Sequence, residues 1–331
     1  MIDVQRLIVR APNWLGDAVM ALPAIAAARR ACAGRTMILA APASIAPVFE
    51  EHTDAAPDEI LTIDSSREAE QLRDARADAI FLLQNSFGSA WTARRAGIAE
   101  RWGYRASGRG VLLTKGVGRP RGKVHQVEYY ASLARGLGFE VDADARPHIR
   151  ATERSGEKAL ALLTSAGAQP GAPLVGFAPG AAYGHAKRWP PDRVAQVIAR
   201  LNASGVTGVL VGAPDDRHTG RAIESSLPAG SRVANLIGRT TLRELVGVVS
   251  RCAAFVSNDS GAMHIAAALG VPLTAIFGPT DERATAPAGQ ADVILRQVFC
   301  RPCMLRECPI DHRCMKRIDV DSVLHSVMAH L

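Results

Sequence analysis

Three short stretches of this 331-residue chain combine residue types that can bind a phosphorylated ligand. Residues 12–17 are Pro-Asn-Trp-Leu-Gly-Asp, residues 179–190 contain two glycines and a Lys-Arg pair, and residues 257–264 are Ser-Asn-Asp-Ser-Gly-Ala-Met-His. Glycine lets a backbone approach a ligand closely, and backbone N–H groups together with a lysine hold phosphate. The chemistry expected is phosphate binding, with a carboxylate, Asp17, placed just after the first predicted strand.

Residues 257–264 lie between an apolar run typical of a buried strand and an alanine-rich run typical of a helix. Asp259 or Ser260 is expected to cap that helix, whose first N–H groups favour an anion. Gly261 leaves room for a ligand, and His264, one turn into the helix, is expected to face it. An ordinary capped turn between a strand and a helix is the alternative that these residues leave open.

Residues 179–190 follow a predicted strand at 174–178 and precede a helix opened by two prolines. Gly180 and Lys187 are the residues expected to contact phosphate, through a backbone N–H and a charged ammonium. The spacing matches neither a Walker A loop nor a G-x-G-x-x-G fingerprint. A flexible basic loop remains the alternative.

Short apolar runs alternate with helical stretches twice along the chain, which predicts an α/β fold with parallel, doubly wound sheets. Strands are predicted at 6–10, 36–40, 59–63, 79–83, 174–178, 208–212, 233–235, 253–256 and 273–277. Helices are predicted at 18–33, 43–51, 67–77, 151–166 and 319–331. Asp17 is a candidate cap for the first of them, and Pro23 is expected to mark its first turn or a kink. The Gly/Pro-rich break at 167–173 suggests two domains, residues 1–165 and 166–331. Ligands of such folds bind at the carboxyl ends of strands, where Asn13, Trp14 and Asn85 are placed.

The formal net charge of +7 and the isoelectric point near 9.4 favour an anionic partner. Residues 94–123 concentrate Arg, Lys and Gly, and Arg101 and Arg105 in this segment are candidates for binding a phosphorylated acceptor or anionic lipid headgroups. A solvated surface is the alternative. The segment has no interleaved aromatics of the kind that bind single-stranded nucleic acid, so no nucleic-acid partner is expected. A signal peptide and an apolar run of about 20 residues are both missing, which predicts a cytoplasmic protein.

The motifs at 13–17, 179–190 and 258–264, taken in order over nearly the whole chain, resemble the ADP-heptose:lipopolysaccharide heptosyltransferases of glycosyltransferase family 9. The lysine loop and the Trp-Leu-Gly-Asp start are most similar to the type II branch. The resemblance implies a GT-B fold, in which two Rossmann-like domains face across a cleft. It implies inverting transfer of L-glycero-D-manno-heptose from ADP-heptose to the heptosyl-Kdo2-lipid A inner core of lipopolysaccharide, without a catalytic cofactor.

The resemblance also implies roles for residues and a location. Asp17 would be the general base, and Lys187 with the helix start at 259–261 would stabilise the leaving diphosphate. Asp215 or Asp216 would hold the ribose, and the main chain near Thr240 would contact adenine. The acceptor lies on the inner face of the inner membrane, so the protein would bind that anionic surface as a peripheral protein. Types I and III of the family, a sugar-nucleotide epimerase and a non-catalytic nucleotide-binding protein remain alternatives.

Four of the six cysteines are clustered near the C-terminus, with the pattern C-x2-C-x4-C-x5-C: Cys300, Cys303, Cys308 and Cys314. This spacing suggests a small structural metal site, with zinc as the usual tetrathiolate metal and iron as another. Reduced thiols in a basic loop, or disulfides formed during handling, are the alternatives. Cys32 and Cys252, isolated among apolar residues, are expected in the core.

Overall fold

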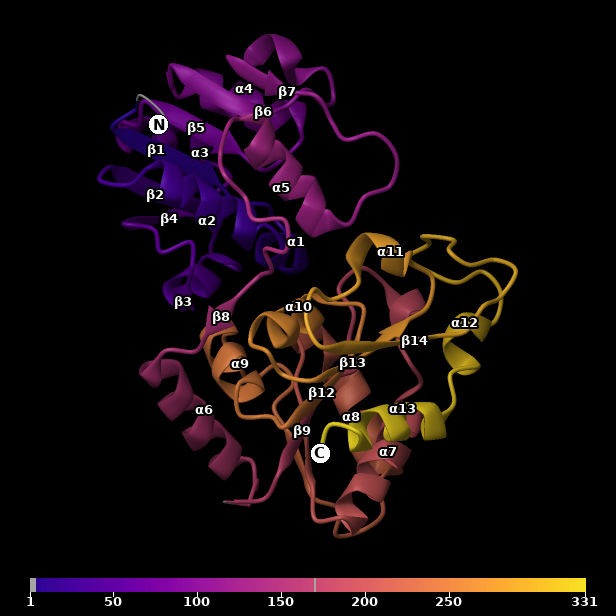
Figure 1. Ribbon diagram of the computed structural model, residues 1–331. Coiled ribbons are helices and arrows are strands. Elements are labelled where there is room, and N and C mark those ends of the chain that lie inside the picture. The colour runs from indigo at the N-terminus through magenta and orange to yellow at the C-terminus, as the bar shows by residue number, and fades with distance from the viewer. Residues whose placement is uncertain (1–3, 170) are drawn as a thin grey trace. The chain divides into compact units, whose positions relative to one another are not determined.

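A computed structural model describes residues 4–169 and 171–331, which form two compact units, Met1–Ile149 and Arg150–Leu331 (Figure 1). The boundary lies earlier than the expected 165/166. Helix α6 (Glu153–Ser165) belongs to the second unit because its apolar side, including Ala159 and Leu163, packs against α9 (Leu242–Val249) and the core beneath it.

The first unit is built on a parallel sheet with the order β4-β2-β1-β5-β6-β7. Ile8 in the central strand pairs with Ile38 on one side and Ile80 on the other, and all three side chains are buried. The strands are β1 (Arg6–Arg10), β2 (Thr36–Pro42), β4 (Glu59–Ile63), β5 (Ala79–Leu82), β6 (Glu100–Tyr104) and β7 (Lys115–Val117), with β3 (His52–Thr53) pairing β8 (Ile149–Arg150) apart from this sheet. Its helices are α1 (Leu15–Met20), α2 (Leu22–Ala31), α3 (Glu68–Asp74), α4 (Phe87–Arg95) and α5 (Gln126–Gly136), with 3-10 turns η1 (Ala46–Glu50) and η2 (Arg109–Leu112).

The second unit repeats this plan with the order β11-β10-β9-β12-β13-β14, again parallel. The strands are β9 (Leu174–Ala178), β10 (Thr207–Leu210), β11 (Val233–Asn235), β12 (Ala254–Asn258), β13 (Leu273–Phe277) and β14 (Ala291–Leu295). The remaining helices are α7 (Pro191–Ala203), α8 (Arg217–Ser226), α10 (Gly261–Ala268), α11 (Glu282–Thr285), α12 (Arg313–Lys316) and α13 (Val320–Met328), with η3 (His185–Lys187) and η4 (Pro214–Asp216).

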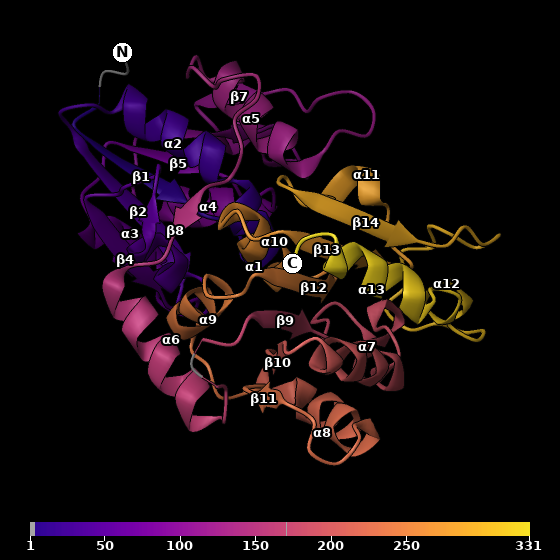
Figure 2. The ribbon, with the colours of Figure 1, turned by 60° about the horizontal axis from the view of Figure 1, so that its bottom comes forward.

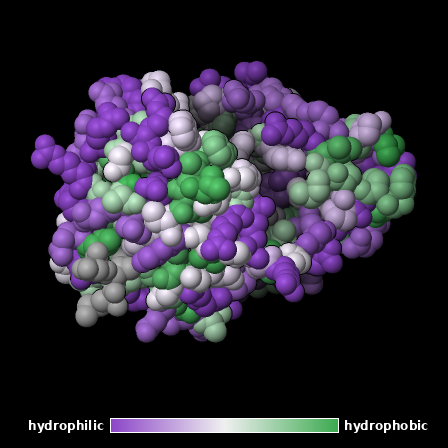
Figure 3. Space-filling view, turned by 90° about the horizontal axis from the view of Figure 1, so that it is seen from above, coloured by the Kyte–Doolittle hydropathy of each residue, from purple (hydrophilic) through white to green (hydrophobic). Residues whose placement is uncertain are grey.

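Apolar cores lie on both faces of the second sheet. Helices α7, α8 and α13 contribute Ile198, Ile223 and Val323 to one core, whereas α9 and α10 contribute Val248 and Ala266 to the other (Figure 2). The inner strands β9, β10, β12 and β13 are buried on both faces, which explains why they appear in the sequence as continuous apolar runs rather than alternating ones. The surface seen in Figure 3 is hydrophilic over most of its area, with smaller hydrophobic patches.

Most predicted strands lie within two residues of their predicted positions, but two helix predictions are wrong. The helix expected at 18–33 is broken at Ala21, because Pro23 at the start of α2 lacks an N–H and its ring would clash with an unbroken preceding turn. Asp17 is not the cap of a helix, because α1 already begins at Leu15. It lies in the first turn of α1, where Trp14 is the N-cap residue. The helix expected at 43–51 is only the short 3-10 turn η1.

Each sheet reverses its strand order once, between β1 and β5 in the first unit and between β9 and β12 in the second. Loops on the two sides of such a switch point diverge, which leaves a crevice at the carboxyl ends of the strands. Asp17 and Asn85 follow β1 and β5, and Lys187 and Asp259 follow β9 and β12. Throughout residues 4–169 and 171–331, every helix is too short or too polar to span a bilayer.

Candidate active site

Asp17 is held by two side chains of helix α5. The Tyr130 hydroxyl donates to Asp17 Oδ1 at 3.2 Å, and the Gln126 side chain also hydrogen-bonds to this carboxylate. Gln126 and Tyr130 are four residues apart, so they project from one side of α5, which packs against α1. Two neutral groups thus orient the carboxylate, and the residue is only partly covered.

Burial raises the pKa of the Asp17 carboxyl above its ordinary value, and the bonds from Tyr130 and Gln126 offset part of that rise. Burial also holds the pKa of Tyr130 well above 10, so the phenol remains a neutral donor. A carboxylate with a raised pKa accepts a proton more readily than an ordinary aspartate, while it remains ionised near neutrality if the rise is moderate. The environment of Asp17 therefore suits a general base.

A buried cation underlies the loop that carries Asn13 and Trp14. Arg10, only 3% exposed, pairs with Glu68 at 2.8 Å and donates to Asn13 Oδ1 at 3.2 Å. Gln84 lies 2.6 Å from the same Asn13 oxygen, and its carboxamide oxygen, when turned toward Arg10, accepts from the guanidinium at 2.9 and 3.0 Å. This network ties the loop after β1 to the loop after β5.

Two of the predicted acceptor-binding residues, Asn85 and Trp14, differ in exposure. The Asn85 Oδ1 atom is buried and has no hydrogen-bond partner within the described part of the chain, so its capacity to accept a hydrogen bond is unused. The Trp14 side chain is 58% exposed.

The basic segment contains both exposed and structural arginines. Arg101, predicted to bind the acceptor, instead donates to the carbonyls of Leu112, Ile98 and Ala99 at 2.5–2.8 Å. Arg109 is fully buried, and burial lowers its pKa to about 10. Arg105 is exposed, as a ligand-binding role requires. Arg101 thus has a structural role that the sequence could not reveal, and its predicted contact with the acceptor stays a prediction.

In the second unit, Asn258 joins the two loops at the switch point. Its amide donates to the carbonyls of Pro179 and Gly180 at 2.7 and 3.4 Å, and its oxygen accepts from the Trp189 N–H at 3.3 Å. Asn258 is 2% exposed, so this bridge is shielded from water. The bridge fixes the start and end of the loop that carries Lys187.

Lys187 is buried against Asp259, with Nζ 2.6 Å from Oδ2. The Thr280 hydroxyl donates to the same oxygen at 2.7 Å, and the ammonium also lies 4.8 Å from the centre of the Tyr183 ring. The pair brings the predicted cation and the predicted helix start into direct contact. The positive charge of the buried Lys187 is thereby balanced by the carboxylate of Asp259.

Helix α10 begins at Gly261 with Ser260 at the N-cap position, but the predicted side-chain cap is not formed. The Ser260 side chain makes no capping hydrogen bond and instead lies 3.1 Å from the Ser257 hydroxyl. His264 is 5% exposed, one turn into the helix. The first turn of α10 is thus left without a side-chain cap, which suits the binding of an anion at its N-terminus.

Asp216 and Asp215 differ sharply. Asp216 is buried and accepts from Arg188 at 2.9 Å, whereas Asp215 is exposed. A Cβ atom on Gly180 would lie 2.1 Å from Asp216 Oδ2, so this carboxylate packs directly on the backbone of the Lys187 loop and requires glycine there. Thr240 is half-buried just before α9, in the loop after β11.

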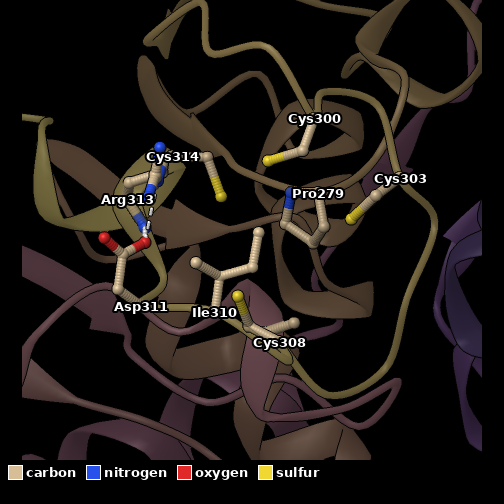
Figure 4. Close-up of a pocket in the computed structure, with 9 residues that line it drawn as sticks. Pro279, Cys300, Cys303, Cys308, Ile310, Asp311, Arg313 and Cys314 are labelled. Carbon is tan, nitrogen blue, oxygen red and sulfur yellow. Dashed lines mark hydrogen bonds and ion pairs between the residues drawn. The ribbon is translucent and has the colours of Figure 1, made fainter.

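The four clustered cysteines line one small cavity, and their sulfurs turn toward it around Pro279 and Ile310 (Figure 4). All are free thiols, and no group of three or more His, Cys, Asp or Glu side chains in residues 4–169 and 171–331 is arranged closely enough to hold a metal ion. The predicted ligands are thus gathered but do not form a closed site. Cys32 and Cys252 are buried in the cores, as predicted.

Sequence reasoning missed several residues that shape these sites: Gln126, Tyr130, Arg188, Asn258 and Thr280. Asn258 and Arg188 lie inside recognised motifs, and their neighbours drew attention away from them. Gln126 and Tyr130 carry a weak signal, since a helical i, i+4 pair of polar residues follows a basic loop. Thr280 carries no signal that distinguishes it from other threonines.

Comparisons of the sequence and the fold with known proteins point to one family. The sequence profile of glycosyltransferase family 9 (heptosyltransferase) matches residues 66–313. Lipopolysaccharide heptosyltransferase 2 of Salmonella typhimurium is 32% identical over 310 residues, covering 88% of each chain, and that of Escherichia coli is 31% identical with the same coverage. The solved structure of E. coli ADP-heptose lps heptosyltransferase II superposes with a TM-score of 0.85 at 28% identity, covering 98% of each chain. The predicted GT-B class is confirmed.

Proposed function

The chain belongs to glycosyltransferase family 9 (heptosyltransferase), and on this premise we propose that it transfers L-glycero-D-manno-heptose from ADP-heptose to heptosyl-Kdo2-lipid A. The protein is thus a glycosyltransferase acting in lipopolysaccharide core biosynthesis. The observation that carries the mechanism is Asp17, a carboxylate whose pKa is raised by burial and which lies after the central strand of the first unit.

In the proposed reaction, an acceptor hydroxyl attacks the anomeric carbon of the donor heptose. Its proton passes to Asp17, the new glycosidic bond forms, and the bond from the anomeric carbon to the phosphate oxygen breaks to release ADP. Asp17 acts as the base, and Tyr130 and Gln126 keep it oriented. Heptosyltransferases of this family need no catalytic cofactor, so the charge on the leaving diphosphate is met by side chains and backbone.

Lys187 and the N-terminus of α10 are the groups we assign to the diphosphate. Gly180 and Gly261 allow the backbone to approach it, and His264 donates to a phosphate or a sugar hydroxyl. The Lys187 ammonium has three N–H donors, so it can donate to a phosphate oxygen while it still donates to Asp259. Negative charge on the leaving group grows in the transition state, so this preorganised cation stabilises the transition state more than the ground state.

For the nucleoside, we assign the ribose to Asp216 rather than Asp215, because Asp216 packs on Gly180 at the start of the Lys187 loop. A carboxylate has about four lone-pair positions, so Asp216 can hold Arg188 and still accept from ribose hydroxyls. The main chain near Thr240 is assigned to adenine. On the acceptor side we assign Asn13, Trp14, Asn85 and Arg105.

We further propose that the protein works as a peripheral protein on the cytoplasmic face of the inner membrane. Phe87 and Trp91, four residues apart on α4, are 47% and 46% exposed, and Val111 on the adjoining η2 is 85% exposed. Arg94 and Arg95 at the end of α4 are also exposed. Apolar and aromatic side chains beside cations are the composition of surfaces that bind anionic lipid interfaces.

The membrane proposal is tested by co-sedimentation with vesicles containing anionic lipid at low and high salt. Binding at low salt that is lost as salt rises, and weakened by combined Arg94→Gln and Arg95→Gln substitution, supports it. Arg101→Gln is not a suitable control, because that side chain holds backbone carbonyls. Equal sedimentation with neutral and anionic vesicles would remove charge from the explanation.

The activity is tested by incubation with ADP-heptose and lipid A acceptors that carry Kdo2 alone, Kdo2 with one heptose, or Kdo2 with two heptoses, followed by mass spectrometry. Addition of one heptose only to the singly heptosylated acceptor supports the proposed type II activity. Addition to Kdo2 alone, or only to the doubly heptosylated core, would assign type I or type III instead. An epimerase would alter ADP-heptose without any acceptor, and a binding protein would leave both substrates unchanged.

A further inference from the structure

The segment between β14 and α12 is held by hydrogen bonds and an ion pair rather than by secondary structure. Arg301 donates to the carbonyls of Gly278 and Thr280 and pairs with Glu282. Residues 296–312, all within the described part of the chain, form neither a helix nor a strand. Several of its large apolar side chains face solvent, including Phe299 at 79%, Met304 at 52% and Ile310 at 51% exposure. A loop of this length without secondary structure or an apolar core of its own is usually disordered or secured by another kind of link.

The cysteines are the feature that can supply this link. Three lie on the segment and the fourth, Cys314, is buried in α12, yet all four line one cavity (Figure 4). The His312 backbone N–H donates to Cys308 Sγ at 3.3 Å, the type of contact that supports a metal-bound thiolate. The four thiols come from positions spread over residues 300–314 but meet at one cavity, so a bond that links all four would close this segment into a loop.

The charge around the cavity also favours a metal thiolate centre. A divalent ion with four thiolates carries a net charge of −2, which needs compensating cations nearby. Residues 300–317 contain five Lys and Arg residues against two carboxylates, and Glu282 outside this range pairs with Arg301, so two cations remain in excess. Arg313 lines the cavity and pairs with Asp311 at 3.0 Å. An uncharged disulfide pair would need no such excess of cations.

We propose that Cys300, Cys303, Cys308 and Cys314 bind one structural zinc ion as a tetrathiolate. Four S–H bonds break, four zinc–sulfur bonds form, and the four protons pass to solvent. The thiols face the cavity without being at ligating distance from one another, so binding draws the side chains inward. The ion then closes residues 300–314 into a small knuckle.

This knuckle is bonded to the Lys187 loop. The Ala186 N–H donates to the Arg306 carbonyl at 2.9 Å, and the Tyr183 hydroxyl donates to the Met304 carbonyl at 2.8 Å. A Cβ atom on Gly184 would lie 2.3 Å from that same Arg306 carbonyl oxygen, so the two backbones pack tightly. Zinc that orders the cysteine segment therefore also orders the loop that presents Lys187.

The test is elemental analysis of protein purified under reducing conditions without chelator. We expect about one zinc per chain, with little retained by Cys303→Ser or Cys308→Ser and full retention by the control Cys32→Ala, which lies in the first unit. Wild-type protein loaded with Co²⁺ should show the intense absorption of a tetrahedral thiolate complex, a readout that needs no variant to fold. Metal-free protein with four titratable thiols, or with a disulfide, would overturn the site. One equivalent of iron would overturn the choice of zinc.

The coupling to the Lys187 loop rests on the proposed donor site and is tested by ADP calorimetry. Chelator-treated protein should bind ADP several-fold more weakly and recover when zinc is restored. Equal ADP affinity with and without zinc would overturn the coupling, while the metal analysis would still stand. Failure of the zinc-loaded protein to bind ADP would count against the proposed function instead.

Discussion

Replacement of Tyr130 by Phe tests the base directly. The substitution removes the hydroxyl that donates to Asp17 Oδ1 and leaves the ring to pack in α5. The carboxylate form of Asp17 accepts this bond, so its loss destabilises the ionised state. The pKa of Asp17, already raised by burial, must then rise further. Because the ionised form is the proposed base, the variant should lose activity on the acid side of the pH profile.

The size of the effect follows from the length of the bond. Hydrogen bonds to charged groups contribute about 1.5–3 kcal/mol, and the 3.2 Å separation is long for an O–H···O bond, so the lower figure applies. About 1.5 kcal/mol corresponds to roughly a tenfold change in the protonation equilibrium. We expect kcat/KM of Tyr130→Phe to be about tenfold below wild type in the acid limb and to approach wild type at higher pH.

The assay is kcat/KM for heptose transfer measured across the pH range, with Tyr129→Phe as the matched control. Tyr129 is the neighbouring tyrosine on α5, and its ring contacts Tyr130 and Tyr104 rather than Asp17. The control should follow the wild-type profile. A loss in Tyr130→Phe that is equal at every pH would show that Tyr130 acts through packing or substrate contact. An acid limb at the same pH as in wild type would show that the limb does not report the ionisation of Asp17.

Asp17→Asn should lower transfer by about 10²- to 10⁴-fold while ADP affinity is kept. Burial raises the pKa of Asp17 in the folded state, so ionisation of this carboxyl lowers the stability of the fold as pH rises. The uncharged variant should therefore melt no lower than wild type at neutral pH. A lower melting temperature, or near wild-type turnover, would contradict this reasoning. Lys187→Met should weaken ADP binding and also destabilise the fold by about 3–5 kcal/mol, because Asp259 is left buried without its partner. Adding Asp259→Asn should restore the free energy of unfolding but not ADP affinity, and recovery of both would make Lys187 purely structural. Asp216→Asn should weaken binding of ADP more than Asp215→Asn does, with equal calorimetric affinities counting against our choice of ribose ligand.

The sequence predicted what is local. A strand, a polar loop and a helix start follow one another within a few residues, so the order of residue types alone placed Asp17, Lys187 and Asp259 at the carboxyl ends of strands. The paired sheets follow from the same alternation. Predicted boundaries are least exact where a single residue decides them: Pro23, expected to mark a first turn or a kink, separates two helices, α1 and α2.

Contacts between segments far apart in the chain could not be predicted from the sequence. Tyr130 reaches Asp17 across 113 residues, and its role depends on how α5 packs on α1. The arginines of the basic segment were treated alike because a sequence does not reveal which guanidinium meets backbone carbonyls and which meets solvent. Arg109 is fully buried and Arg105 is exposed, although they are four residues apart.

If Lys187 binds the donor diphosphate as proposed, its contact with Asp259 has a consequence for selectivity and for turnover. Any anion that enters must compete with an internal carboxylate for the lysine, so a small, singly bound anion such as free phosphate gains little by displacing it. A nucleoside diphosphate has further contacts with which to win the competition. After transfer, Asp259 is positioned to recapture the ammonium as ADP departs. With the proposed donor assignment, Asp259 would therefore lower occupancy of the site by other anions and favour release of ADP.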